Sequence, residues 1–189
     1  ILQGSPATVD MVLTSLSDIM SEEPGNLKLN LKIGEASAGA DLTIATKNGI
    51  EYSGPTTIDA PDLPALAALM GTELAEAPGF DNLSVRGNID GNANAARLGD
   101  ATIVFDDITA KGAVNLDWSG PRSKADGVLS TDKLDLRPYM PPPATSANGF
   151  PAWSDAKMDF SSLRNIDAVF DISTNAIYVN DLEMGESRI

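Results

Sequence analysis

Hydrophobic and polar residues alternate along most of this chain. In "LKLNLKI" at 27–33, the Leu and Ile side chains share one side of an extended chain, and Lys28, Asn30 and Lys32 share the other. The same period of two returns in "TVDMVL", "ADLTIAT", "LSVRGNI", "ATIVF" and "ITAKGAVNLDW". Because successive side chains of a β-strand point to opposite faces, each stretch predicts a half-buried strand.

Turn-forming residues separate these stretches. "KNG" at 47–49, "DGN" at 90–92 and "SGPR" at 119–122 stand between neighbouring strands. Short connections of this kind are typical of antiparallel hairpins. The predicted architecture is therefore an antiparallel meander.

Two or three short helices interrupt the meander. The stretch 15–20 has helical spacing of its apolar residues, and 59–71 is the stronger case, with Asp62 as the N-cap and Gly71 as the stop. A third, shorter helix is predicted at 159–166. Caps and stops of these types mark helix ends.

Strand, short helical turn, polar loop and second strand recur along the chain. This order gives three repeat-like units, at about 8–58, 59–133 and 134–189, and a Pro-rich linker at 141–152 lies inside the last one. Stacked repeats produce an extended sheet. We predict a mainly β fold with a few short helices: an elongated, curved antiparallel sheet with a partial groove. We interpret residues 1–189 as one excised section of a longer protein.

The apolar side of such a sheet needs a cover, because burial of a Leu, Ile, Val or Phe side chain stabilises the folded state by about 1.5–3 kcal/mol. A second sheet, the short helices or the acyl chains of a lipid would each serve, and alternation alone does not separate them. We predict that the lipid-facing residues, if lipid is the cover, lie in two stretches: Leu27, Leu29, Leu31, Ile33, Ile108, Ala110, Val114 and Leu116.

Composition removes several classes of function. The formal net charge is −14, and the 13 Lys and Arg residues are scattered singly, which argues against nucleic acid, whose phosphates require basic patches. The chain has no Cys and no His. Disulfides, thiolate metal sites, Ser–His–Asp triads and histidine acid–base catalysis are therefore excluded. The densest apolar run, at 63–70, is far shorter than the roughly 20 residues of a membrane span.

The remaining catalytic patterns are weak. "STDK" at 130–133 matches the S-x-x-K motif, in which a Lys one helical turn away activates a Ser nucleophile. Here the four residues lead directly into a strand-like "LDL", so we interpret Ser130 and Lys133 as part of a polar turn. The acidic pairs Glu22–Glu23 and Asp106–Asp107 are interpreted as solvated charges, the second pair on opposite faces of a strand.

A calcium loop is suggested by Asp90, Asn92 and Asn94, at the first, third and fifth positions of such a loop. The Gly and the closing Glu that the loop needs are replaced by Ala95 and Ala101, so a hairpin turn is the better interpretation. We predict no enzyme activity, no cofactor and no metal site.

The C-terminal third carries a more specific pattern. "GVLSTDKLDLRPYMPPP", followed by "WSDAKMDFSSLRNIDAVFDISTNAIYVNDLEMGESRI", closely resembles the AsmA family of Gram-negative envelope proteins. That family has "LDLxPYLP", a Pro/Ala-rich linker, "WSDxPxDLSxLRxxDADxxLS" and a strand ending "LxLGxSRL". "MDF" here replaces the usual "xDL", and the order of the upstream elements is also similar.

The resemblance implies a setting and a role. AsmA-like proteins are anchored in the inner membrane by an N-terminal helix and project a β-rich body into the periplasm, similar to the hydrophobic groove of chorein-type bridge proteins. It implies a part in phospholipid transport toward the outer membrane and in outer-membrane biogenesis, with acyl chains as the partner. The alternative from another class is a structural scaffold, or a protein-binding module that recruits an envelope partner by strand addition.

Overall fold

A computed structural model describes residues 6–14, 16–47, 49–69, 79–140 and 166–189. These residues form one sheet of eleven strands. The strands are β1 (Ala7–Thr14), β2 (Gly25–Ile33), β3 (Ala36–Ala45), β4 (Glu51–Ala60), β5 (Leu83–Asn92), β6 (Ala95–Phe105), β7 (Ile108–Asp117), β8 (Ser123–Asp135), β9 (Ile166–Val179), β10 (Leu182–Met184) and β11 (Ser187–Arg188). Three short helical segments accompany them: α1 (Leu16–Met20), α2 (Leu63–Leu69) and the 3₁₀ turn η1 (Arg137–Tyr139).

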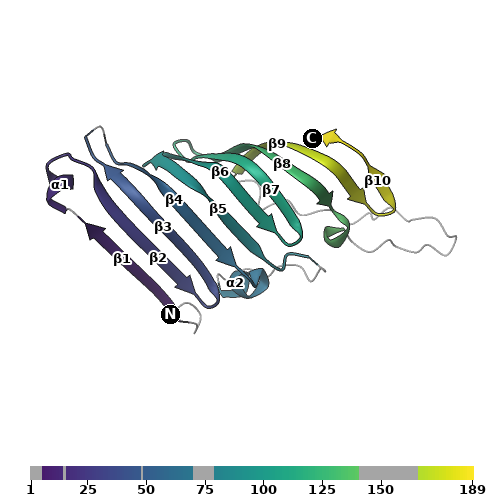
Figure 1. The fold of residues 1–189 in the computed structure, drawn as a ribbon, viewed down its shortest axis with the longest axis horizontal. Coiled ribbons are helices and arrows are strands. Elements are labelled where there is room, and N and C mark those ends of the chain that lie inside the picture. Colours follow the sequence, from purple (N-terminus) through teal and green to yellow (C-terminus); the bar gives the residue numbers. More distant parts are fainter. Residues whose placement is uncertain (1–5, 15, 48, 70–78, 141–165) are drawn as a thin grey trace.

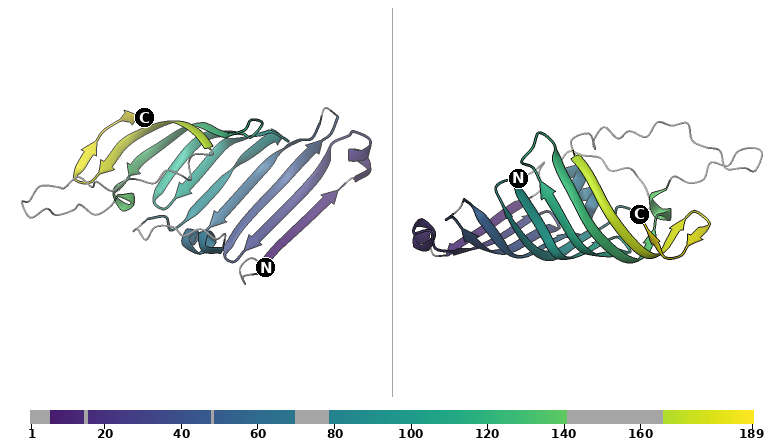
Figure 2. Two further views of the ribbon diagram at one scale, coloured as in Figure 1. Left: turned by 180° about the vertical axis from the view of Figure 1, so that it is seen from behind. Right: turned by 90° about the horizontal axis from the view of Figure 1, so that it is seen from above.

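The strands lie side by side in chain order from β1 to β10, and β11 also pairs with β9 (Figure 1). The sheet is open and curved (Figure 2). This confirms the predicted mainly β, curved fold.

One pair departs from the predicted meander, because β8 and β9 run parallel. All other neighbouring strands are antiparallel. Parallel neighbours require a crossover of a dozen or more residues, and residues 136–165 supply one between the two strands. The prediction of a wholly antiparallel sheet is therefore wrong here. The Pro-rich linker 141–152 and most of the helix predicted at 159–166 lie outside the described residues, and Ile166 begins β9.

Two-residue turns join four of the antiparallel pairs: β2–β3, β5–β6, β6–β7 and β9–β10. Gly34 and Asp106, each the first residue after a strand, have φ angles of 58° and 50°. Two-residue hairpin turns favour this backbone conformation. The turn expected at 90–92 comes slightly later, because β5 continues through Asn92, whose Oδ1 accepts the backbone N–H of Asn94 at 2.8 Å.

Both predicted helices in the described regions are present. Asp62 caps α2 by accepting the N–H of Ala65 at 2.8 Å, whereas the expected stop at Gly71 lies outside the described residues. In Figure 1, α1 lies at one rim of the sheet, and α2 and η1 lie at the opposite rim. The helices therefore border the sheet and do not form a second layer over its middle.

The alternating pattern does not predict strand β4. Gly54 and Pro55 interrupt its apolar pattern, and Pro has no N–H for the ladder. Pairing with β3 accordingly has a gap between Ala40 and Thr43. The strand forms because its two neighbours hold it along its length, which sequence alternation alone does not reveal.

Glycine at position 112 is required by the close approach of β7 and β8. Its φ is 155°, and a Cβ built there would overlap the carbonyl oxygen of Val128. Backbone atoms cannot move aside as the end of a side chain can, so only Gly fits this approach.

We expect Gly112→Ala to lower the free energy of unfolding by at least about 2 kcal/mol, from backbone strain and the forced separation of β7 and β8. Urea unfolding followed by circular dichroism measures the loss. Gly185→Ala is the matched control, because a Cβ there meets no atom within 4 Å. Equal stability of the two variants would contradict the account of Gly112.

Candidate functional site

The candidate site is the apolar face of the sheet. Directly paired residues of neighbouring strands point to the same face. One unbroken row of paired residues crosses most of the sheet in this order: Val9, Leu31, Ala38, Ile58, Val85, Ile103 and Ala110. The face is therefore continuous from β1 to β7.

The structure places both predicted lipid-facing stretches on this face. Leu31 of β2 and Ala110 of β7 belong to the same row. The other predicted residues of each stretch stand at every second position along the same strand, so they point to the same face. Strands β3 to β6 lie between the two stretches, so the structure puts them on one surface but not in contact. Their contact with lipid stays a prediction.

Exposure of the apolar face is graded along the sheet. Val9 and Met11 of β1 are 68% and 65% exposed, whereas Ala101 in β6 is only 1% exposed. Most large side chains in β5 and β6 are half-buried. Among the described residues, no large side chain is fully buried. The apolar face is thus most open at the β1–β2 end and partly covered by its own side chains in the middle.

Short elements cover the ends of the strands. Ile19 of α1 packs on Gly25, which is buried and leaves no room for a side chain. The hydroxyl of Thr46 donates to the carbonyl of Ile19 at 3.2 Å. These contacts hold α1 at the rim, over the start of β2.

At the opposite rim, Asp106 joins three separate segments. Its carboxylate accepts the backbone N–H groups of Phe80, Asp81 and Asn82 at 2.8–2.9 Å and the hydroxyl of Tyr139 at 2.6 Å. Successive N–H groups that converge in this way form an anion-binding nest. Asp106 fills that nest and so fixes the loop after α2 and η1 to the β6–β7 turn.

Aromatic packing accompanies this carboxylate. The rings of Phe80, Phe105 and Tyr139 form a triangle with centroids 5.2–5.8 Å apart. Edge-to-face and stacked contacts of this kind add to the gain from buried area. The cluster therefore covers the apolar face where β6 ends.

Two opposing effects set the pKa of Asp106. Partial burial raises the pKa, but the hydrogen bonds from Tyr139 and from the three backbone N–H groups lower it by more. The pKa of Asp106 therefore lies below its usual value. For Tyr139, burial and the neighbouring Asp106 carboxylate raise the pKa. Sequence reasoning missed the role of Asp106 as the anchor of these segments, because it placed Asp106 on a strand as a solvated charge. The Asp-Asp pair between two alternating stretches was the available sign of a turn.

A second polar cluster fixes η1 to the end of the sheet. Asp135 accepts from Nε of Arg137 at 2.8 Å and pairs with Nζ of Lys133 at 2.9 Å. Both cations lie 5.0–5.1 Å from the centre of the Tyr178 ring. The hydrogen bond from Arg137 is the main cause that holds the pKa of Asp135 well below its usual range.

The S-x-x-K pair is not arranged for nucleophilic catalysis. The hydroxyl of Ser130 donates to the carbonyl of Lys111 at 3.3 Å, and Lys133 is held by Asp135. A nucleophile and its base need a mutual hydrogen bond. The structure gives these two side chains different partners, on a β-strand and not on a helix.

A depression of about 690 Å³ lies on the polar side of β7, β8 and β9. It is lined mainly by hydroxyl and charged side chains, among them Ser130, Ser173 and Arg188. Arg188 is already paired with Asp171. This depression is therefore separate from the apolar face.

Within the described ranges, no three acidic side chains gather where they could hold a metal ion. Asn92, the centre of the suggested calcium loop, instead accepts the backbone N–H groups of Asn94 and Ala95. This is the geometry of a hairpin turn. In the same ranges, none of the helices has the length and apolar character that a membrane crossing requires.

We expect Asp106→Asn to lower the free energy of unfolding by about 1–3 kcal/mol, because it removes a charged acceptor of four hydrogen bonds. Asn tolerates the positive φ at this position, so the effect is that of the carboxylate and not of the backbone. Urea unfolding measures it. Asp107→Asn, an exposed neighbour in the same turn, is the control, and an equal loss in both variants would show that the hydrogen bonds of the Asp106 carboxylate contribute nothing.

The contribution of Asp106 also depends on pH. Since its pKa is lower in the folded state than the roughly 3.9 of an unfolded Asp, its stabilisation is present above that unfolded pKa and is lost as the pH falls through the folded one. The difference in unfolding free energy between the wild type and Asp106→Asn should therefore shrink between about pH 5 and about pH 2. A pH series of urea unfolding curves checks this, and a constant difference would refute the assignment.

Comparison with known proteins finds no matching family model, no significantly similar curated protein and no significantly similar solved structure.

Proposed function

We propose that this chain is a non-enzymatic section of a cell-envelope protein, whose apolar sheet face carries the acyl chains of phospholipids between the inner and outer membranes. The observation that supports this proposal most directly is the apolar face of the described sheet. It spans β1 to β7, most of its large side chains are exposed or half-buried, and the described helices lie at its rims.

The chemistry of the two faces suits this role. An acyl chain has no hydrogen-bonding groups, so it loses nothing when it replaces water on a surface of Leu, Val, Ile and Met. Each of these side chains gains free energy as its exposed area is covered, at about 25 cal/mol per Å². The opposite face carries Lys28, Asn30 and Asp41, which remain solvated.

The setting is proposed from the sequence pattern. Residues 134–189 resemble the AsmA family, and this resemblance supports a periplasmic body tethered to the inner membrane by an anchor elsewhere in the protein. Outer-membrane biogenesis is the process that such a body would serve. The proposal needs no cofactor.

A scaffold or protein-binding module is the second candidate, favoured by the free edge of β1. Among the strands that the structure describes, β1 pairs only with β2. Unpaired N–H and C=O groups along an edge strand can pair with a strand of another protein. That role predicts a polypeptide at the edge and no lipid on the face.

Lipid binding separates the two candidates. We expect native mass spectrometry of the purified chain, after exposure to phospholipid vesicles, to show bound phospholipid. The double variant Met11→Gln/Leu31→Gln should reduce the bound fraction by at least about tenfold, because it places amides where two apolar contacts would form.

The control changes the same kind of exposed residue on the opposite face. Val12 and Val128 are 55% and 64% exposed there, and Val12→Gln/Val128→Gln should leave lipid binding unchanged. If the wild-type chain never carries phospholipid, the lipid proposal fails and the scaffold is favoured. An equal loss in both double variants would show that the apolar face is not the binding surface.

A further inference from the structure

A cleft of about 480 Å³ opens between α2 and the β2–β3 turn, at one end of the apolar face. Its apolar lining comes from both elements: Ile33, Ala36, Ala65, Leu66, Ala68 and Leu69. Ile33 and Ala36 are paired at the end of their strands. Because Ile33 follows Leu27, Leu29 and Leu31 at every second position, the cleft continues the apolar face to the rim.

Two carboxylates also line this cleft. Glu35 occupies the turn, and Asp62 precedes α2 as its N-cap. Both side chains are exposed. Lys32, the nearest base along the chain, alternates with Ile33 and so points to the opposite face of β2. The cleft therefore combines a hydrocarbon lining with negative charge at its border.

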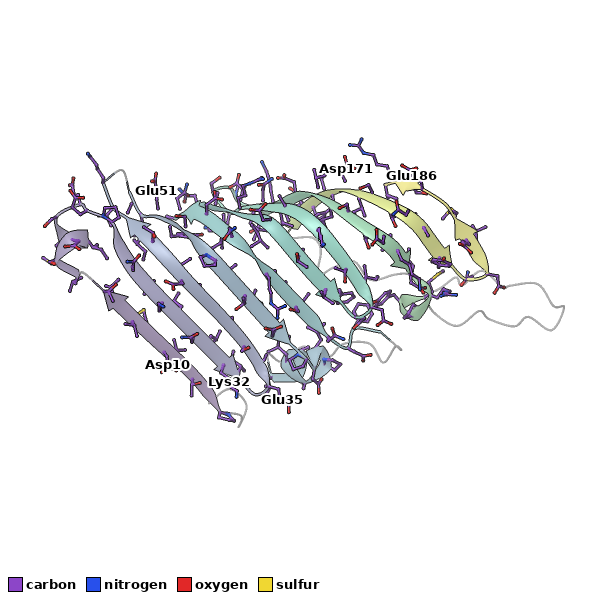
Figure 3. The ribbon with its side chains drawn as sticks, viewed as in Figure 1. Asp10, Lys32, Glu35, Glu51, Asp171 and Glu186 are labelled. Carbon is purple, nitrogen blue, oxygen red and sulfur yellow. The ribbon has the colours of Figure 1, made fainter. Side chains whose placement is uncertain are left out.

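The charge continues along the same rim. Asp81, Asp106 and Asp107 lie in the neighbouring loop and turn, and Figure 3 shows Glu35 at this rim, away from Glu51 at the other. An anion that approaches the cleft meets like charges at short range, where repulsion is weakly screened. A cation is instead attracted by these carboxylates.

We propose that this cleft binds the hydrocarbon end of an amphiphile whose head group carries an ammonium, and that Glu35 and Asp62 select such lipids over lipids with a net negative head group. The inference rests on the proposed function, because it assumes that lipid reaches the apolar face. It adds the chemical class of head group that the rim accepts. Among phospholipids, a phosphatidylethanolamine fits this class and a phosphatidylglycerol does not.

Other occupants suit the cleft less well. A second copy of the chain brings the same net charge of −14 and therefore repels this rim. An extended peptide would bury backbone N–H and C=O groups against a lining without polar partners apart from the two carboxylates. A hydrocarbon chain with a cationic head satisfies both parts of the cleft.

The test compares two lipids of matched acyl chains. Native mass spectrometry after incubation with dioleoyl phosphatidylethanolamine or dioleoyl phosphatidylglycerol, each in the same mild detergent, should show roughly fivefold more of the first lipid bound. Raising salt from about 0.1 M to about 1 M, which shortens the screening length from roughly 10 Å to roughly 3 Å, should reduce this preference.

Variants assign the preference to the cleft. Glu35→Gln/Asp62→Asn should abolish it while retaining lipid binding, and Asn at 62 keeps the helix cap. Glu23→Gln/Glu51→Gln removes as much charge outside the cleft and should leave the preference intact. Ala68→Trp fills the cleft and should lower the binding of both lipids several-fold, whereas Ala93→Trp, at the opposite rim, should not.

The outcomes separate the inference from the proposed function. Lipid binding without a head-group preference, or a preference unchanged in Glu35→Gln/Asp62→Asn, overturns the inference and leaves the lipid-carrying proposal standing. Full binding by Ala68→Trp likewise overturns it, as does a lipid-free dimer that Ala68→Trp dissociates. Binding of neither lipid by the wild type refutes the proposed function and the inference together.

Discussion

Strand pairing is the interaction on which this structure depends. In most domains the burial of large apolar side chains stabilises the fold, but here no large side chain is fully buried in the part of the chain that the structure describes. The continuous ladder from β1 to β10 instead satisfies the backbone and aligns the side chains in rows. Each row packs sideways within a single layer. The face above it is left free, and that freedom is what makes a function on the face possible.

The polar groups that anchor the turns and short helices lie where the strands end. Asp106 and Asp135 each join a turn or short helix to the sheet, and Asp62 caps α2. Such groups would be costly on the apolar face, where no partner or water would satisfy them. Their placement at the rims keeps the face uniform. It also explains why the described helices border the sheet, since their anchoring partners are at its edges.

Alternation is enough to predict most of the strands, because a strand that alternates Leu with Lys or Asn has one apolar and one polar face, and this difference specifies its register. It failed at β4, where Gly54 and Pro55 break the pattern and the neighbouring strands impose the conformation. The parallel pairing of β8 and β9 joins strands that are distant in sequence, and the local pattern of a strand does not encode the direction of such a neighbour. The anchoring role of Asp106 was missed for a similar reason, because its partners, residues 80–82 and Tyr139, are distant from it in sequence and meet it only in the fold. Within each of the two apolar stretches, by contrast, the period of two alone predicts which side chains share a face.

The open face and the negative charge constrain each other. Two copies could bury their apolar faces against one another, because large exposed apolar surfaces commonly take part in protein–protein association. A net charge of −14, with acidic side chains at the rims, opposes that association. This repulsion does not act on a neutral hydrocarbon. The acidic side chains at the rim attract a cationic group. The composition that opposes self-association therefore does not oppose the proposed amphiphile, and the proposed ammonium head group has the sign of charge that the acidic rim attracts.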